Sequence, residues 1–218
     1  MADKPRALAS PDFALAVALA ALAGWVDATA YVRLSRIFVS FMSGNSTRLA
    51  ASLSAAASPK AALTLAVLAA FVGGVILGET IAIVAGKRGH AAALLLESVV
   101  LFAAMGAAWP AGSLFLPAVL LAIALGVQNA SVHQAGGMRV ALTYVTGTLV
   151  RLGRRIAAAL AGRGPWRDAL PYLFLWLGMM AGAAGGAALA RTSAVLAIAL
   201  AGTAAFVFAG VALLRRPT

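Results

Sequence analysis

The chain has 218 residues, of which 63% are hydrophobic and 11% are charged, and its formal net charge is +11. A mean hydropathy of +0.97 lies outside the usual range of soluble globular domains, so we predict an all-α, polytopic protein embedded in a lipid bilayer. The cations stand singly or in pairs between apolar segments, as they do in cytoplasmic loops, which argues against nucleic acid as a partner. The absence of cysteine excludes disulfides and thiolate chemistry.

Six apolar stretches are long enough, or nearly so, to cross a bilayer as helices, which takes about 20 residues each. They are residues 13–32, 61–86, 91–108, 114–134, 169–190 and 194–214. The first follows Lys4 and Arg6 and contains Ala21-Leu22-Ala23, as a signal peptide would. Cleavage there would separate Gly24-Trp25-Val26-Asp27 from its helix, so we predict an uncleaved first span.

Two segments of the chain repeat one another without a gap. Residues 36–49 align with residues 139–152 at an offset of 103 (139 − 36), and in each copy the Gly of a hydroxyl-Gly pair stands eight positions after one Arg and four before another. Gly24-Trp25-Val26-Asp27 matches Gly126-Val127-Gln128-Asn129 at an offset of 102 (126 − 24). Downstream, Gly74 and Gly78 match Gly178 and Gly182 at an offset of 104 (178 − 74). We therefore predict one membrane domain, residues 1–218, built from two repeat units, 13–108 and 114–214.

The repeated hydroxyl-Gly segments are too short to cross a bilayer. Eleven residues lie between the flanking arginines in each copy, and as a helix they would span about 16 Å, half the bilayer. We predict that each is a short re-entrant or broken helix, which requires surrounding protein or a water-filled cavity. The alternative is eight complete spans.

Charge asymmetry favours six spans plus two re-entrant segments, with cytoplasmic N- and C-termini. That topology leaves four cations outside, Arg33, Arg36, Lys60 and Arg191, against eleven inside: Lys4, Arg6, Lys87, Arg88, Arg139, Arg154, Arg155, Arg163, Arg167, Arg215 and Arg216. Eight spans would divide the same residues nine to six. Because three spans per unit is an odd number, the two repeats would be inverted, and inverted repeats place their binding site at the repeat interface. Eight spans would instead make the repeats parallel.

The two Gly motifs are similar to those of a known family. Gly-x-x-Asp followed by Phe-Val-Ser-Phe-Met-Ser-Gly-Asn, and Gly-x-x-Asn followed by Thr-Tyr-Val-Thr-Gly-Thr, resemble the YoaK-like family of bacterial inner-membrane proteins, a domain of unknown function. Ser43 stands where that family more often has Thr. The resemblance covers nearly the whole chain and implies a compact, multi-pass domain of the bacterial inner membrane, with no substrate or reaction attached.

Asp27 and its repeat partner Asn129 are the first candidate site residues. A carboxylate about fifteen residues into a span is costly unless it is paired or wetted. Asp27 therefore fits a proton- or cation-coupling role, or the role of a fixed ion-pair partner for Arg33, Arg36 or Arg48.

The repeated segments supply the other candidates. Arg48 and Arg151 either form a doubled anion-binding element at the repeat interface or reach separately toward headgroups. The predicted loop tips, which would bind a solute or simply satisfy backbone groups during close packing, are Ser43, Gly44, Asn45, Thr146, Gly147 and Thr148.

Other polar or small residues carry weaker signals. Glu79 and Glu97 are intramembrane acids without an acidic twin, and either titrates or pairs near Lys87 and Arg88. His133 has no second ligand nearby, so we predict no metal and no other cofactor. The glycine stripes 74/78 and 178/182/186 fit packing within the chain better than a homodimer face, although they allow both. No hydrolase or nucleotide-binding signature is present, so we do not expect an enzyme.

Two functions fit these features. The first is a small transporter or channel for a small polar or ionic solute, with its site between the two Gly segments. The second is a non-transporting membrane module whose repeated loops dock a lipid or a partner. A transporter requires a polar path to Asp27 or to the loop tips, whereas a module would bury these groups in direct contacts.

Overall fold

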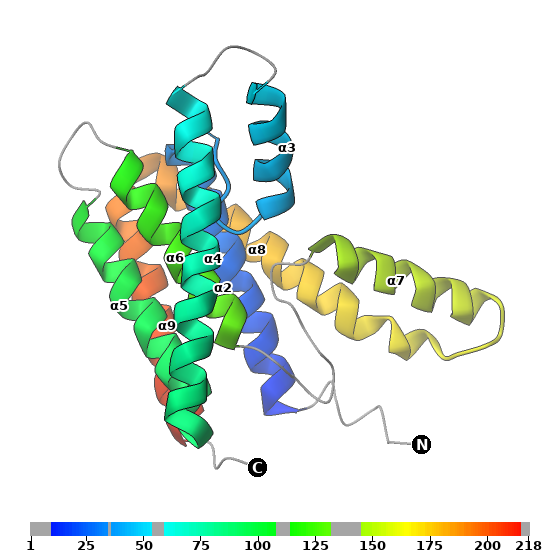
Figure 1. Ribbon diagram of the computed structural model, residues 1–218. Coiled ribbons are helices and arrows are strands. Elements are labelled where there is room, and N and C mark those ends of the chain that lie inside the picture. Colours follow the sequence, from blue (N-terminus) through cyan, green and yellow to red (C-terminus); the bar gives the residue numbers. More distant parts are fainter. Residues whose placement is uncertain (1–9, 35, 54–58, 108–113, 132–144, 215–218) are drawn as a thin grey trace.

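The computed structural model describes residues 10–34, 36–53, 59–107, 114–131 and 145–214, and every regular element there is helical (Figure 1). The six elements that match the predicted apolar stretches are α2 (Pro11–Arg33), α4 (Pro59–Ala85), α5 (Gly89–Ala107), α6 (Phe115–Ser131), α8 (Leu170–Thr192) and α9 (Ala194–Leu214). Two shorter helices lie between them, α3 (Met42–Leu53) and α7 (Val145–Leu160), together with the 3-10 turns η1 (Gly86–Arg88) and η2 (Trp166–Asp168).

The apolar helices suit a bilayer. Four segments are long and apolar enough to cross one: Pro11–Arg33, Lys60–Ala107, Leu170–Thr192 and Ala194–Leu214. The second segment contains both α4 and α5, joined by η1, and α6 is a shorter apolar helix. Large hydrophobic side chains such as Ile83 and Val84 point outward, being 70% and 82% exposed. Such a surface is stable in lipid and costly in water, so the chain is a polytopic helical membrane protein.

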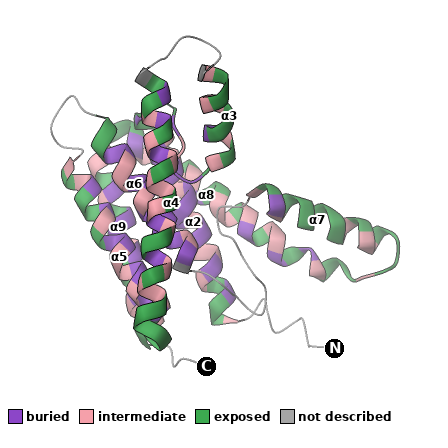
Figure 2. Ribbon diagram, viewed as in Figure 1, coloured by how far each residue is buried: buried purple, intermediate pink, exposed green. Residues whose placement is uncertain are grey.

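The first helix begins where local chemistry favours it. The Ser10 side chain accepts a hydrogen bond from the Phe13 backbone N–H at 3.1 Å, and Pro11 stands in the first turn. A serine cap satisfies one of the free N–H groups at a helix start, and Pro needs no acceptor there. This helix, α2, lies at the centre of the bundle, and α2 and α6 each carry more buried residues than any other described helix (Figure 2).

Glycines allow two pairs of helices to pack backbone against backbone. In the α2–α8 pair, a Cβ on Gly182 would meet the Ala21 carbonyl, and one on Gly186 would meet the Trp25 carbonyl. In the α4–α6 pair, a Cβ on Gly74 would meet the Ile123 carbonyl, and one on Gly78 would lie 2.9 Å from the Val127 Cα. Close approach of this kind is the usual role of small residues in membrane helices. These glycines therefore pack within the chain, as the first of the two interpretations expected.

The same contacts favour an alignment of the glycines that differs from the one predicted from the sequence. Ile123 follows Ala21 by 102 positions (123 − 21), but its partner Gly74 corresponds to Gly182 at an offset of 108 (182 − 74). The sequence comparison paired Gly74 with Gly178, which lies one helical turn before Gly182. A stripe with glycine at every fourth position can slip by one turn and still align glycine with glycine, so the sequence could not fix this register.

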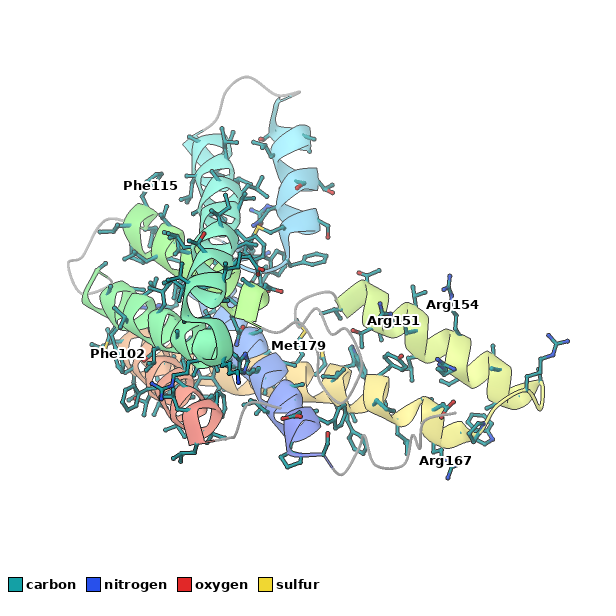
Figure 3. All side chains as sticks on the ribbon, turned by 60° about the horizontal axis from the view of Figure 1, so that its bottom comes forward. Phe102, Phe115, Arg151, Arg154, Arg167 and Met179 are labelled. Atoms are coloured by element: carbon teal, nitrogen blue, oxygen red, sulfur yellow. The ribbon has the colours of Figure 1, made fainter. Side chains whose placement is uncertain are left out.

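The two short helices form hairpins with the spans that follow them. Helix α3 packs against α4, and α7 packs against α8. The Arg155 guanidinium lies 3.7 Å from the Asp168 carboxylate and connects α7 to η2. The hairpins diverge, whereas the N-terminal ends of α3 and α7 lie close to each other beside the middle of the bundle in the two views of Figures 1 and 3.

Candidate functional site

The backbone that leads from α2 into α3 is irregular and largely buried. It turns at Arg36, which has a positive φ of 63°, and then buries Ile37, Val39 and Ser40 against the bundle. Backbone outside a helix or a sheet leaves N–H groups with no acceptor of its own, which apolar surroundings do not tolerate. The fold therefore has to supply acceptors for this segment from a side chain.

Asp27 is that acceptor. Its carboxylate oxygen Oδ1 accepts hydrogen bonds from the backbone N–H groups of Val39 at 2.7 Å and Ser40 at 2.9 Å, and the residue is only 5% exposed. Bonds from N–H groups to a carboxylate are stronger than bonds between neutral groups. Asp27 thus fixes the entry segment of α3 beside the last two turns of α2.

This arrangement differs from the pairing predicted for Asp27. We expected the carboxylate to reach Arg48 or a loop-tip hydroxyl, or to pair with Arg33 or Arg36. Instead, two backbone amides hold it, and Arg48 donates a hydrogen bond to the backbone carbonyl of Arg36. Arg48 therefore donates to a backbone carbonyl of this segment, and Asp27 accepts from two of its backbone N–H groups. The need of the backbone for partners explains both contacts.

Asn45 fixes the first turn of α3 onto the segment. It is fully buried, and its Nδ2 donates a hydrogen bond to the Phe38 carbonyl at 2.6 Å. Its Oδ1 is a buried acceptor without a hydrogen-bond partner among the described residues. Phe38 also stacks on Tyr31 and meets Phe41 edge-on, with ring centroids 4.9 and 5.3 Å apart. The start of α3 is therefore rigidly held.

The other predicted residues of the first copy are more open. Ser43 is exposed and Gly44 is half-buried, and a Cβ on Gly44 would meet the Phe41 ring at 2.6 Å. The first N–H groups of a helix have no acceptor within the helix, and they carry a partial positive charge. Ser43 and Gly44 belong to this first turn, where a polar ligand would find donors.

The second copy is described only from Val145 onward. The segment 132–144, with His133 and Arg139, lies outside the described residues. Gly147 is buried and Thr148 half-buried in the first turns of α7, whereas Thr146 and Arg151 are exposed. Asn129 is half-buried, and its Nδ2 donates to the Leu125 carbonyl of its own helix at 2.8 Å.

The predicted residues come together in part. The N-terminal ends of α3 and α7 approach each other, which brings the two Gly segments into one region of the bundle (Figures 1 and 3). Arg48 and Arg151 lie further along the two helices, which diverge, and Figure 3 shows Arg151 on the flank of α7. The structure thus supports a shared region at the helix starts, and it gives the two arginines separate surroundings.

An apolar groove lies elsewhere in the bundle. It has a volume of about 270 Å³ and is bordered by α2, α8 and α9, including Leu22, Gly182 and Phe208. The indole N–H of Trp25, which also lines the groove, donates to the Ala197 carbonyl at 2.8 Å, so its polar atom is already satisfied. This groove suits hydrocarbon and is not part of the polar region. Within the described part of the chain, no group of three His, Cys, Asp or Glu side chains is placed to hold a metal ion.

Sequence reasoning missed the backbone partners of Asp27 and gave Glu97 little weight. Glu97 is fully buried, although the sequence only marked it as an acid within a span. In the sequence, the backbone partners of Asp27 were signalled by the run Ile37-Phe38-Val39. Its β-branched and aromatic residues favour non-helical backbone directly after the span that carries Asp27.

Comparison with known proteins agrees with these features. The family model described as "Protein of unknown function (DUF1275)" matches residues 15–213. A UPF0700 transmembrane protein of Rhizobium meliloti (strain 1021) is 36% identical over 199 residues, which cover 88% of this chain and 82% of the relative. No solved structure matches the chain. Both similarities confirm the resemblance to an uncharacterised family of membrane proteins that the Gly motifs suggested, and the chain belongs to the DUF1275 family.

Proposed function

We propose that this protein is a small transporter or channel for a small polar or ionic solute, which passes between the N-terminal ends of α3 and α7. The observation that carries the proposal is the position of these two ends, which lie near each other beside the bundle (Figures 1 and 3). Interrupted helices whose N-termini meet at a repeat interface are a common construction for solute sites in transporters. The candidate contacts are the first-turn residues Ser43, Gly44, Thr146, Gly147 and Thr148.

The charge distribution of this region favours anions or solutes rich in oxygen. Both helix starts present partly positive N–H groups, and α3 and α7 also carry Arg48 and Arg151. The one acid beside the entry segment, Asp27, already accepts two backbone N–H groups there. Small inorganic anions are therefore the first solutes to test.

We also propose that the bundle is an inverted repeat of units 13–108 and 114–214, in the bacterial inner membrane, with both termini in the cytoplasm. The α2–α8 and α4–α6 contacts support the repeat. Adding 102 to the residue numbers of α2 gives the matching positions on α6, and adding 108 to those of α4 gives the matching positions on α8. These two offsets convert the contacts of one helix pair into the contacts of the other. Gly24 faces Met179 and Gly126 faces Phe71, which satisfies the same offsets (126 − 24 and 179 − 71). An accidental similarity would not preserve the register of several contacts.

A flux assay tests the transport proposal. The purified protein in liposomes should pass inorganic anions, and Ser43→Trp and Thr146→Trp should each reduce the flux at least about tenfold, because a large side chain would fill the space between the helix starts. Both positions are exposed, so the fold should tolerate the substitutions. Thr203→Trp, at an exposed position on α9, is the matched control and should retain flux. A screen of ions and neutral solutes that stays flat would favour the non-transporting module.

Single-cysteine labelling tests the orientation, and the cysteine-free chain gives no background. We expect labelling from the outside at Lys60→Cys, and from the inside at Lys87→Cys, Arg139→Cys and Arg163→Cys. Lys60, Lys87 and Arg163 are exposed, and a membrane-impermeant maleimide should reach them. Labelling of Lys60→Cys from inside together with Lys87→Cys from outside would contradict the inverted repeat and would favour eight spans.

A further inference from the structure

Glu97 is a buried carboxyl group that the proposed solute path does not use. It lies midway along α5, is 0% exposed, and neither of its carboxyl oxygens has a hydrogen-bond partner within the described chain. Asp27 is also buried, but two backbone amides hold it. The two buried acids therefore differ in their contacts. Asp27 has a structural role, whereas Glu97 has no contact that offsets the free-energy cost of burying a carboxyl group.

The helices around Glu97 offer no charge to balance it. Helix α5 packs against α4, α6, α9 and η1, and α6 and α9 contain no ionisable side chain. The ionisable groups on the remaining elements form no hydrogen bond with Glu97; they are Lys60 and Glu79 on α4, Lys87 and Arg88 on η1, and His90 at the start of α5.

The nearest polar neighbour along the helix is already occupied. The Ser98 hydroxyl donates a hydrogen bond across the helix interface to the Gly202 carbonyl of α9 at 2.9 Å. One helical turn before and after Glu97 on α5, the side chains are the fully buried apolar Leu94 and Leu101. An ionised carboxylate without a partner in such surroundings is strongly unfavourable, and the group takes up a proton instead.

We propose that Glu97 is a proton-binding site of the membrane domain. A proton is the cation that one carboxyl group can hold without further ligands, whereas a metal ion would need additional oxygen or nitrogen donors. In the packed conformation the carboxyl group keeps its O–H bond. When the α5–α9 interface opens to water, that bond breaks, the proton passes to a water molecule, and the electron pair stays on the carboxylate. This site does not depend on transport of a solute.

Infrared spectroscopy of the full-length protein in lipid tests the site directly. At neutral pH the wild type should show the carbonyl stretch of a protonated carboxyl group. Glu97→Gln should lose the band, while Glu79→Gln and Asp27→Asn should keep it. Exposure to alkaline buffer should remove the band reversibly. A wild-type spectrum without the band at neutral pH, or a band that survives in Glu97→Gln, would overturn the proposal.

A second measurement covers the case in which Glu97→Gln does not fold. A hydrophobic carbodiimide reacts with protonated carboxyl groups inside membranes, and mass spectrometry of the labelled wild type locates the adduct. We expect the adduct on Glu97 and a smaller yield as the pH is raised. A wild type that shows the infrared band but carries its adduct on Asp27 or Glu79, and none on Glu97, would assign the proton elsewhere and overturn the proposal.

Discussion

Gly74→Ala should destabilise the protein by about 1–3 kcal/mol, the usual cost of overpacking a close contact. The new methyl group would meet the backbone of Ile123 on α6, and backbone atoms cannot turn aside as a flexible side chain can. The α4–α6 pair would have to separate, which would remove contacts along both helices. A lower midpoint temperature of thermal unfolding in detergent, followed by size-exclusion chromatography, would measure the effect.

The adjacent glycine supplies a matched control in the same helix. A Cβ on Gly73 would find nothing within 4 Å. Gly73→Ala should therefore leave the stability unchanged or raise it by up to about 1 kcal/mol, the difference in helix propensity between the two residues. If both substitutions lowered the midpoint equally, the glycines would act through helix flexibility, and the close approach of α4 and α6 would not be their purpose.

Replacement of Asp27 by Ala should destabilise the fold by about 3 kcal/mol or more, because two buried hydrogen bonds to a charged acceptor would be lost. The N–H groups of Val39 and Ser40 would then have no side-chain acceptor. The entry to α3 should loosen first. Hydrogen exchange at residues 36–41, measured by mass spectrometry together with the thermal midpoint, should show the change.

Asp27→Asn is the informative companion. The amide oxygen can still accept both N–H groups, so this variant should fold and lose only about 1 kcal/mol or somewhat more, since neutral bonds are weaker than charged ones. It also reproduces Asn129, the residue that the sequence alignment of residues 24–27 with residues 126–129 places opposite Asp27. An Asn variant as unstable as the Ala variant would show that the negative charge itself, and not the acceptor oxygen, holds the segment.

The sequence by itself determined the class of fold and most of its elements. Apolar runs of bilayer length are local signals, and all six became helices whose ends lie within about three residues of the predicted ends. The two short polar segments were also recognisable, because their length and flanking arginines set them apart. Hydrophobicity and segment length determine whether a segment is stable in lipid or in water. Membrane helices can therefore be predicted without knowing which helix packs against which.

The tertiary structure decided which groups contact one another. Only the return of the chain after α2 brings the Val39 and Ser40 amides to Asp27, and nothing in the spacing of the residues distinguishes these donors from Arg48. The glycine stripe allowed two registers, and only the contact of Gly182 with Ala21 selects one. The isolation of Glu97 likewise depends on what α6 and α9 place around it. Hydrogen bonds and close packing have a range of a few ångströms, so they are fixed only once the helices have assembled.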